Sequence, residues 1–206
     1  MSERRAAQAT SAPTGFWADK RVFVIGSSGL LGSRMVKELN SRRAITIGHV
    51  PDRGRHLTHR DDPETEPYFT VHGVLEDHET VLRAINEYEA DTVLHLGAQP
   101  IVGTANRNPR STFEANIRGT WNVLDACREL GGKGRRIVVA SSDKAYGTAP
   151  SLSHDETMPL NGRHCYDVSK TCIIAQTYQP HLRSSGPFHP RGEFLRGEGS
   201  QLGAQR

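Results

Sequence analysis

The stretch Val22-Phe-Val-Ile-Gly-Ser-Ser-Gly-Leu-Leu-Gly32 joins a short apolar run to three glycines. The apolar part is mostly β-branched, which is typical of a strand buried inside a parallel sheet. Gly26 permits a tight turn after this strand, Gly29 lets a pyrophosphate approach the backbone, and Gly32 lets the next helix pack closely on the strand. The helix N-terminus then presents free N–H groups to phosphates. The stretch therefore predicts a dinucleotide-binding turn, with an ordinary glycine loop as the alternative.

Outward from this stretch, strands and helices alternate along the chain. Apolar runs predict strands over residues 22–25, 45–50, 68–71, 92–96 and 137–140, and helical periodicity predicts helices from residue 30 and over 81–88, 112–130 and 166–178. This alternation, with short connections, favours an α/β fold with a doubly wound parallel sheet of the Rossmann type. We expect the sheet to be incomplete at its C-terminal side, because no sixth strand follows. Trp121 and Cys127 are expected on the inner face of the long helix.

Composition and charge place the chain among ordinary globular proteins. It has 206 residues, of which 35% are hydrophobic and 24% charged, and a formal net charge of +3. Basic residues are scattered rather than interleaved with aromatic ones, so no nucleic-acid partner is predicted. The cysteines and histidines show no metal-ligand spacing, so no metal is predicted. We found neither a secretory signal nor an apolar run of membrane length, and we expect a cytoplasmic protein with no membrane partner.

Composition also divides the chain into three parts. Residues 1–15 lack periodicity and are expected to form a disordered leader. Residues 16–178 are the predicted dinucleotide-binding domain. Residues 179–206 are rich in Gly, Pro and Arg and are expected to form a disordered tail.

A second group of polar residues follows the fifth predicted strand. Tyr166 and Lys170 are spaced four apart on a helix and so share one face. The ammonium of Lys170 can lower the phenol pKa of Tyr166, which would make a phenolate base available near neutral pH. Ser142, at the end of the strand, can hydrogen-bond the substrate oxygen on which this base acts. The combination with the glycine turn favours a catalytic site over a chance pairing.

The second predicted strand should end near an acidic residue that binds the adenosine ribose. Asp52 is the carboxylate nearest to that position, and it follows His49-Val-Pro51. An ordinary loop residue is an equally good interpretation of Asp52. NAD is favoured as the cofactor, and NADP stays open.

These motifs resemble the extended short-chain dehydrogenase/reductase family, and within it the CDP-glucose 4,6-dehydratases. The resemblance runs from about residue 16 to residue 178. It is carried by residues 16–22, His95-Leu-Gly-Ala-Gln-Pro100, residues 108–120, Ser142-Asp-Lys-Ala-Tyr-Gly147 and Tyr166-Asp-Val-Ser-Lys170. The resemblance implies NAD as cofactor, a nucleotide-sugar substrate and a homodimer formed through the long helices.

The same resemblance implies a role for each residue of the second polar group. Tyr166 would remove the proton of the sugar 4-hydroxyl, supported by Lys170 and Ser142. Asp143 would protonate the leaving 6-hydroxyl, and Lys144 would stand where a base removes the 5-proton. Epimerases of the family lack an acid at the position of Asp143. An epimerase or reductase, or a non-catalytic NAD-binding module, remains the alternative to a dehydratase.

Further residues are implied to contact the cofactor. Together with the turn, the cofactor-binding residues are expected to be Gly26, Ser28, Gly29, Leu30, Leu31, Gly32, Asp52, Leu96, Gly97, Ala98, Gln99, Asn116, Tyr166 and Lys170. Three positions depart from the family pattern. Ile25 replaces a Thr, Gly97 replaces an Ala, and Val74 replaces an Asp that would contact adenine.

The family continues beyond the Tyr166 helix with a strand and a substrate domain that residues 179–206 do not resemble. We considered the codons that could encode residues 181–186, 192–197 and 199–204. When they are read one nucleotide forward, they allow three family-like segments, in the order found in the family. We therefore hypothesise that the coding frame slips near Gln179. On that hypothesis, the chain as written is expected to have no turnover.

Overall fold

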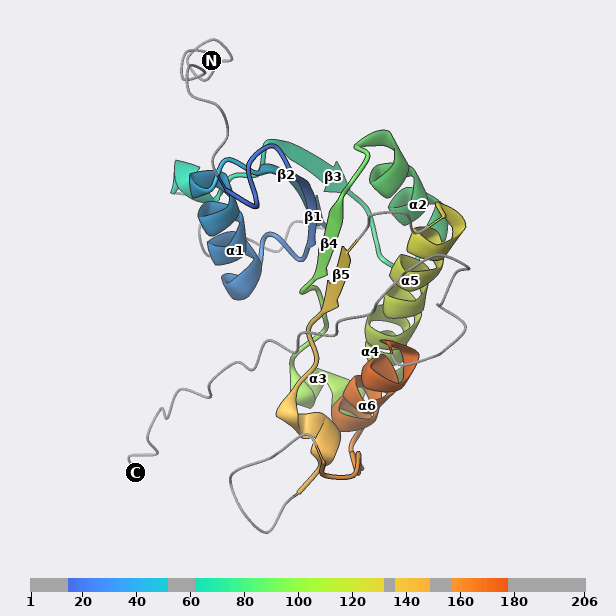
Figure 1. The fold of residues 1–206 in the computed structure, drawn as a ribbon. Helices are drawn as coiled ribbons and strands as arrows, with labels where there is room; N and C mark the ends of the chain where they lie inside the picture. Colours follow the sequence, from blue (N-terminus) through green and yellow to red (C-terminus); the bar gives the residue numbers. More distant parts are fainter. Residues whose placement is uncertain (1–14, 52–61, 132–135, 149–156, 178–206) are drawn as a thin grey trace, which may run out of the picture.

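The computed structural model describes residues 15–51, 62–131, 136–148 and 157–177. The predicted leader apart from Gly15, the predicted tail, Tyr178 and Asp52 lie outside the described residues. Five parallel strands form one sheet in the order β3-β2-β1-β4-β5 (Figure 1). The strands are β1 (Arg21–Ile25), β2 (Ile45–Val50), β3 (Phe69–His72), β4 (Thr92–His95) and β5 (Arg136–Val139). The predicted doubly wound parallel sheet is thus confirmed, and all five predicted strands form within one residue of their expected bounds.

The helices connect these strands in the expected alternation. They are α1 (Leu30–Ser41), α2 (His78–Glu87), α3 (Val102–Arg107), α4 (Pro109–Phe113), α5 (Gly119–Glu129) and α6 (Cys165–Thr177). Two short 3₁₀ turns, η2 (Pro63–Thr65) and η4 (Asp143–Tyr146), precede β3 and follow β5. Helix α3 and both 3₁₀ turns were not expected from periodicity.

Alternate residues of β1 point to opposite faces of the sheet, so each face has its own core. Phe23 and Ile25 pack with α2 and α5, together with residues such as Ile85 and Val123. Val22 and Val24 pack instead with α1. Figure 1 shows α1 on one side of the sheet and the pair α2 and α5 on the other. Burial of both faces explains why β1 reads as a continuous apolar run.

The long helix expected over residues 112–130 differs from that expectation in two respects. It begins at Pro109, with Asn108 as its cap, and it contains a π-helical segment, η3 (Glu114–Arg118), between α4 and α5. The expected inner position of Trp121 is wrong, because half of this side chain is exposed. Cys127 is buried, as expected. The π segment changes the helical phase, so a strict 3.6-residue period cannot assign every face correctly.

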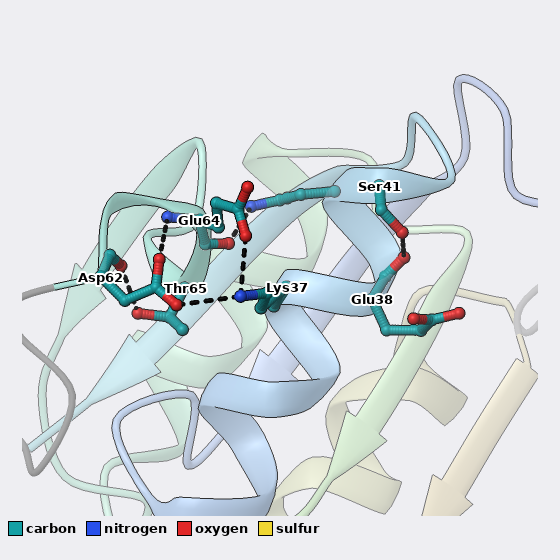
Figure 2. Close-up of polar contacts among 7 residues, drawn as sticks. Lys37, Glu38, Ser41, Asp62, Glu64 and Thr65 are labelled. Atoms are coloured by element: carbon teal, nitrogen blue, oxygen red, sulfur yellow. Dashed lines mark hydrogen bonds and ion pairs between the residues drawn. The ribbon is translucent and has the colours of Figure 1, made fainter.

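A polar cluster ties α1 to the segment that leads into β3 (Figure 2). Lys37 Nζ lies 3.0 Å from Asp62 Oδ2 and 2.7 Å from Glu64 Oε2. Hydrogen bonds to Glu64 and then Asp62 raise the pKa of Lys37. Asn40 adds an amide hydrogen bond to the carbonyl of Glu66 at 2.9 Å. These contacts place the chain beside α1 on its way into the edge strand β3.

Strand β5 lies at the other edge of the described sheet. It pairs with β4 alone among the described strands, and none of its residues is buried. This agrees with a parallel sheet that is incomplete on its C-terminal side. No helix within the described ranges is long and apolar enough to cross a membrane.

Candidate active site

The glycine turn is shaped by close contacts between backbone atoms. Gly26 has a φ of 81°, and a Cβ at this position would lie 2.7 Å from the Cα of Gly97. A Cβ at Gly32 would lie 2.0 Å from the carbonyl oxygen of Gly26. Gly26 and Gly32 are therefore required by the packing of the protein itself.

Gly29 differs from its two neighbours in the motif. A Cβ there would meet the Gly26 oxygen at an ordinary 3.4 Å, and Gly29 caps α1 without a side-chain hydrogen bond. The first N–H groups of α1 thus have no side-chain cap, and they lie beside Gly29, which is exposed. Leu30 and Leu31 flank this opening, and both are more than half exposed. Ser28, partly exposed, lies in the same turn. The opening fits a phosphate-bearing ligand such as a dinucleotide.

Two contacts behind the turn were missed by sequence reasoning. Ser27 is buried, and its hydroxyl donates to the carbonyl of His49 at 3.2 Å. A Cβ at Gly48 would lie 2.6 Å from Ser27 Oγ, so β2 needs a glycine where it passes the turn. A glycine in the interior of a predicted strand was the available signal, because it marks close approach of another segment.

The end of β4 brings together two of the departures from the family pattern. Leu96 N–H donates to the Ile25 carbonyl at 3.0 Å, which aligns the chain beyond β4 with the end of β1. A Cβ on Gly97 would lie 3.1 Å from Ile25 Cγ2. The Ile25 side chain therefore lies beside Gly97 and leaves little space for a side chain at position 97. Ala98 follows in the loop, partly exposed.

Asn116 joins the loop after β4 to the helix α6. It is fully buried in the π segment, and its Oδ1 accepts from the Gln99 N–H at 2.7 Å. Its Nδ2 donates to the Gln99 carbonyl at 3.2 Å and to Ser169 Oγ at 2.9 Å. Ser169 Oγ in turn donates to the carbonyl of Tyr166 at 2.7 Å. The side chain of Asn116 therefore supports the backbone of the sites predicted to hold cofactor and substrate.

The catalytic residues predicted from sequence meet where β5 leads into η4. Ser142 caps η4, and its hydroxyl donates to Asp143 Oδ1 at 2.9 Å and accepts from the Lys144 N–H at 3.2 Å. Tyr166, in the first turn of α6, lies close enough to Ser142 for that side chain to lower the pKa of its phenol. Asp143 and Lys144 are exposed, whereas Tyr166 is 9% exposed. The structure thus brings a phenol, a hydroxyl and a carboxylate into one group.

Groups other than Lys170 set the pKa of the Tyr166 phenol in this structure. Burial raises the pKa of the Tyr166 phenol, the neighbouring Ser142 side chain lowers it, and the charge of Asp143 raises it further. Lys170 Nζ lies 5.9 Å from the centre of the Tyr166 ring and donates to the Ala140 carbonyl at 3.2 Å. Burial lowers the pKa of Lys170 to about 8. Lys170 is not among the groups that shift the phenol pKa in this structure. Its lowering of that pKa stays a prediction.

A small polar cavity of about 150 Å³ lies beside this group. It is lined by Gly147, Thr148, Asn161, Arg163, His164 and Asp167. Asp167 directly follows Tyr166, so the cavity adjoins the first turn of α6. Its wall offers both a guanidinium and a carboxylate, which suits a polar ligand.

A separate group between α2 and α5 was not foreseen from metal-ligand spacing. His78, Asp125 and Glu129 each place one ligand atom within 4.8 Å of the others. His78 Nε2 lies 3.3 Å from Glu129 Oε1, across the two helices. Arg128 already binds Asp125 Oδ1 at 2.6 Å. We interpret the group as a polar cluster where α2 meets α5.

The adenosine end of the predicted site is only partly described. Val74, just beyond β3, is 47% exposed, and its carbonyl accepts from the Asp77 N–H at 3.1 Å. Asp52, the predicted ribose-binding acid, lies outside the described residues.

Comparisons with known proteins agree with this geometry. The family model for GDP-mannose 4,6-dehydratase matches residues 23–184. The CDP-glucose 4,6-dehydratase of Salmonella typhimurium (strain LT2) is 30% identical over 184 residues, which cover 87% of this chain and 51% of that enzyme. The CDP-paratose 2-epimerase of Salmonella typhi is 34% identical over 139 residues, covering 66% of this chain and 41% of that enzyme.

Solved structures give the same result. The UDP-glucose 4-epimerase of Thermus thermophilus, crystallised with NAD, matches with a TM-score of 0.64 and 29% identity, covering 76% of this chain and 49% of that one. The UDP-glucose 4-epimerase of Brucella ovis, also in complex with NAD, matches in fold with a TM-score of 0.68, over 77% of this chain and 46% of that one. The chain spans about half the length of the CDP-glucose 4,6-dehydratase that it matches. With most of its residues covered by the family model, this chain belongs to the GDP-mannose 4,6-dehydratase family, whose relatives include nucleotide-sugar dehydratases and epimerases.

Proposed function

We propose that this chain is the NAD-binding part of a nucleotide-sugar 4,6-dehydratase that acts on a CDP-glucose-like substrate. The observation that carries the proposal is the hydrogen bond of Ser142 to Asp143 at 2.9 Å. Both residues are near enough to Tyr166 to shift the pKa of its phenol. This arrangement places an acid beside the pair that would act on a sugar hydroxyl. A hydroxyl can leave as water only when an acid protonates it, so an acid at this point favours dehydration over epimerisation.

The cofactor would be held by the glycine turn and the loop after β4. The residues proposed to contact it are Gly26, Ser28, Gly29, Leu30, Leu31, Gly32, Asp52, Leu96, Gly97, Ala98, Gln99, Asn116, Tyr166 and Lys170. NAD, when bound, supplies a hydride acceptor and later a hydride donor. The open N-terminus of α1 beside Gly29 suits its pyrophosphate.

The protein's own residues would move the protons. Tyr166 takes the proton of the sugar 4-hydroxyl, while Ser142 hydrogen-bonds the same oxygen. Lys144 removes the proton from carbon 5, and Asp143 gives a proton to the 6-hydroxyl, so that one water leaves. Lys170 stabilises the phenolate of Tyr166 once its ammonium is drawn toward the site.

Calorimetric titration of the chain with NAD and with NADP tests the binding step. We expect NAD to bind, and Gly29→Ala to weaken binding with little change in stability, because Gly29 makes no tight contact within the protein. The melting temperature of Gly29→Ala serves as the control. Binding of NADP with no response to NAD would contradict the cofactor assignment.

The chemistry is tested separately through the tyrosine. The difference in ultraviolet absorption between the wild type and Tyr166→Phe reports the ionisation of this one phenol. We expect saturating NAD to lower the apparent pKa of Tyr166 relative to the ligand-free protein, since a nearby positive charge favours the phenolate. An unchanged pKa would show that Tyr166 does not face the bound cofactor.

Dehydratase activity and the nucleotide sugar remain proposals for the protein as a whole. The assay is the formation of a 4-keto-6-deoxy sugar from CDP-glucose, detected by its absorption in alkali, with GDP-mannose and UDP-glucose as competing substrates. In any form of the protein that shows dehydratase turnover, Asp143→Asn should slow the loss of water more than it slows the initial oxidation of the sugar. Equal loss of both steps would favour an epimerase-like role for the site.

A further inference from the structure

A buried histidine at the end of β4 faces the π segment of the long helix. His95 is 2% exposed, and its Nε2 lies 3.0 Å from Thr120 Oγ1. Thr120 is fully buried, and its hydroxyl donates to the Asn116 carbonyl at 2.6 Å. Sequence reasoning noted His95 only as part of a family-like stretch and did not single out Thr120.

The hydrogen bonds determine which nitrogen of His95 carries the proton. A threonine hydroxyl has one proton, and a carbonyl can only accept, so the Thr120 proton is directed at Asn116. His95 must therefore donate from Nε2 to Thr120 Oγ1, which leaves Nδ1 without a proton. Burial, followed by the nearby Lys170 and His49, lowers the pKa of His95 to about 3, which agrees with a neutral ring.

Thr120 and His95 together hold the backbone of Asn116. In a π segment the backbone hydrogen bonds join residues five apart instead of four apart. The Thr120 hydroxyl adds a further bond to the Asn116 carbonyl, and the contact with His95 fixes the rotation of that hydroxyl. The Asn116 side chain then reaches both Gln99 and Ser169.

We propose that His95 and Thr120 are positioning residues, which fix Asn116 and thereby set the spacing between the Gln99 loop and the first turn of α6 that carries Tyr166. They act through backbone and side-chain hydrogen bonds and touch neither substrate nor cofactor. Their influence on NAD binding rests on the proposed function. Their influence on the Gln99 loop does not.

Thr120→Val tests the proposal, because valine keeps the branched shape and removes the hydroxyl. The Gln99 amide should exchange its hydrogen roughly tenfold faster, the effect of one weakened buried hydrogen bond. NAD affinity should fall by about the same factor. Thr120→Ser retains the hydroxyl and should restore both properties.

Val123→Ala is the matched control on the same helix. Val123 is fully buried in the core and has no polar atom to contribute to this network. The control should lower the melting temperature while Gln99 exchange, measured below the transition, and NAD affinity stay unchanged. If Thr120→Val alters Gln99 exchange no more than Val123→Ala does, the proposal is overturned.

His95 is tested by a pair of replacements. His95→Gln can place an amide N–H near the position of Nε2 and should keep Gln99 exchange close to that of the wild type, whereas His95→Leu should match Thr120→Val. Equal effects of Gln and Leu would reject the donor role of His95. If the chain binds no NAD, the proposed function fails while the exchange measurements still decide the positioning role.

Discussion

The glycine turn and the Asn116 network support neighbouring parts of one site by opposite means. The turn depends on missing side chains, because a Cβ on Gly32 would lie 2.0 Å from a carbonyl oxygen of the same motif. The network depends on side chains that are present, supplied by β4, the π segment, α5 and α6. Backbone clashes cannot relax without moving β1 or α1, whereas hydrogen bonds can be weakened one at a time.

This difference predicts how the two regions fail. A single methyl group added at Gly26 or Gly32 should prevent the native arrangement of β1 and α1. A single lost group in the network should leave the fold intact and change its dependence on pH or ligand. The predictions below separate these two modes.

The largest effect is expected for Gly32→Ala. The new Cβ would overlap the Gly26 carbonyl and lie 2.9 Å from the Cα of Ser27, so the turn would have to open. We expect the free energy of unfolding to fall by more than about 4 kcal/mol, in the range reserved for severe core strain. Urea unfolding followed by circular dichroism measures this.

Gly29→Ala is the control for that experiment. Its Cβ would make only an ordinary 3.4 Å contact, and its φ of −81° suits any residue. Its stability should stay within about 0.5 kcal/mol of the wild type. Comparable losses for the two variants would show that the steric distinction between these glycines is wrong.

Acid should break the network before it affects the turn. The pKa of His95 is about 3 in the folded protein, against an ordinary value of 6.5. The unfolded chain therefore binds more protons than the folded chain between these values, so stability is present above pH 6.5 and is lost as pH falls. Between pH 7 and pH 4 the part due to His95 amounts to about 3 kcal/mol.

The comparison with His95→Gln isolates this contribution from that of the carboxylates. The wild type should lose about 3 kcal/mol more than His95→Gln over that pH interval, measured as urea midpoints at each pH. Lys170, with a pKa of about 8, does not titrate in this interval. Parallel pH profiles for the two proteins would mean that His95 is protonated, or solvated, in the folded state.

The same contrast explains how much could be predicted from the sequence. The turn was predictable because its cause is local: residues 22–32 contain the strand, the glycines and the helix start. The parallel sheet was predictable because burial on both faces gives apolar runs such as Val22–Ile25. In both cases adjacent residues determine the physical result.

The network was not predictable for the opposite reason. His95, Thr120 and Ser169 come from three different elements, and only the tertiary structure brings their polar atoms together. Trp121 was wrongly expected inside, although Cys127 on the same helix was placed correctly. Tyr166, Lys170 and Ser142 were predicted from their spacing and position, and Asp143 was predicted from a family resemblance. Their individual roles stay predictions.

The smallest effect concerns the contact between Ile25 and Gly97, where the turn meets the loop after β4. Gly97→Ala would bring a Cβ to 3.1 Å from Ile25 Cγ2, a distance that forces one of them to move by a few tenths of an ångström. Overpacking of this kind costs about 1 kcal/mol, and the gain from restricting the unfolded chain offsets part of it.

Ile25→Ala removes Cγ2 and should by itself cost about 2–5 kcal/mol through the cavity it leaves. In that background Gly97→Ala has space for its methyl group, so it should become neutral or stabilising. A double-mutant cycle from urea unfolding of the four proteins should therefore give a coupling of about 0.5–1 kcal/mol that favours the double variant. If the two changes are additive within about 0.3 kcal/mol, the pair does not compensate sterically. The departures from the family pattern at these two positions would then be independent.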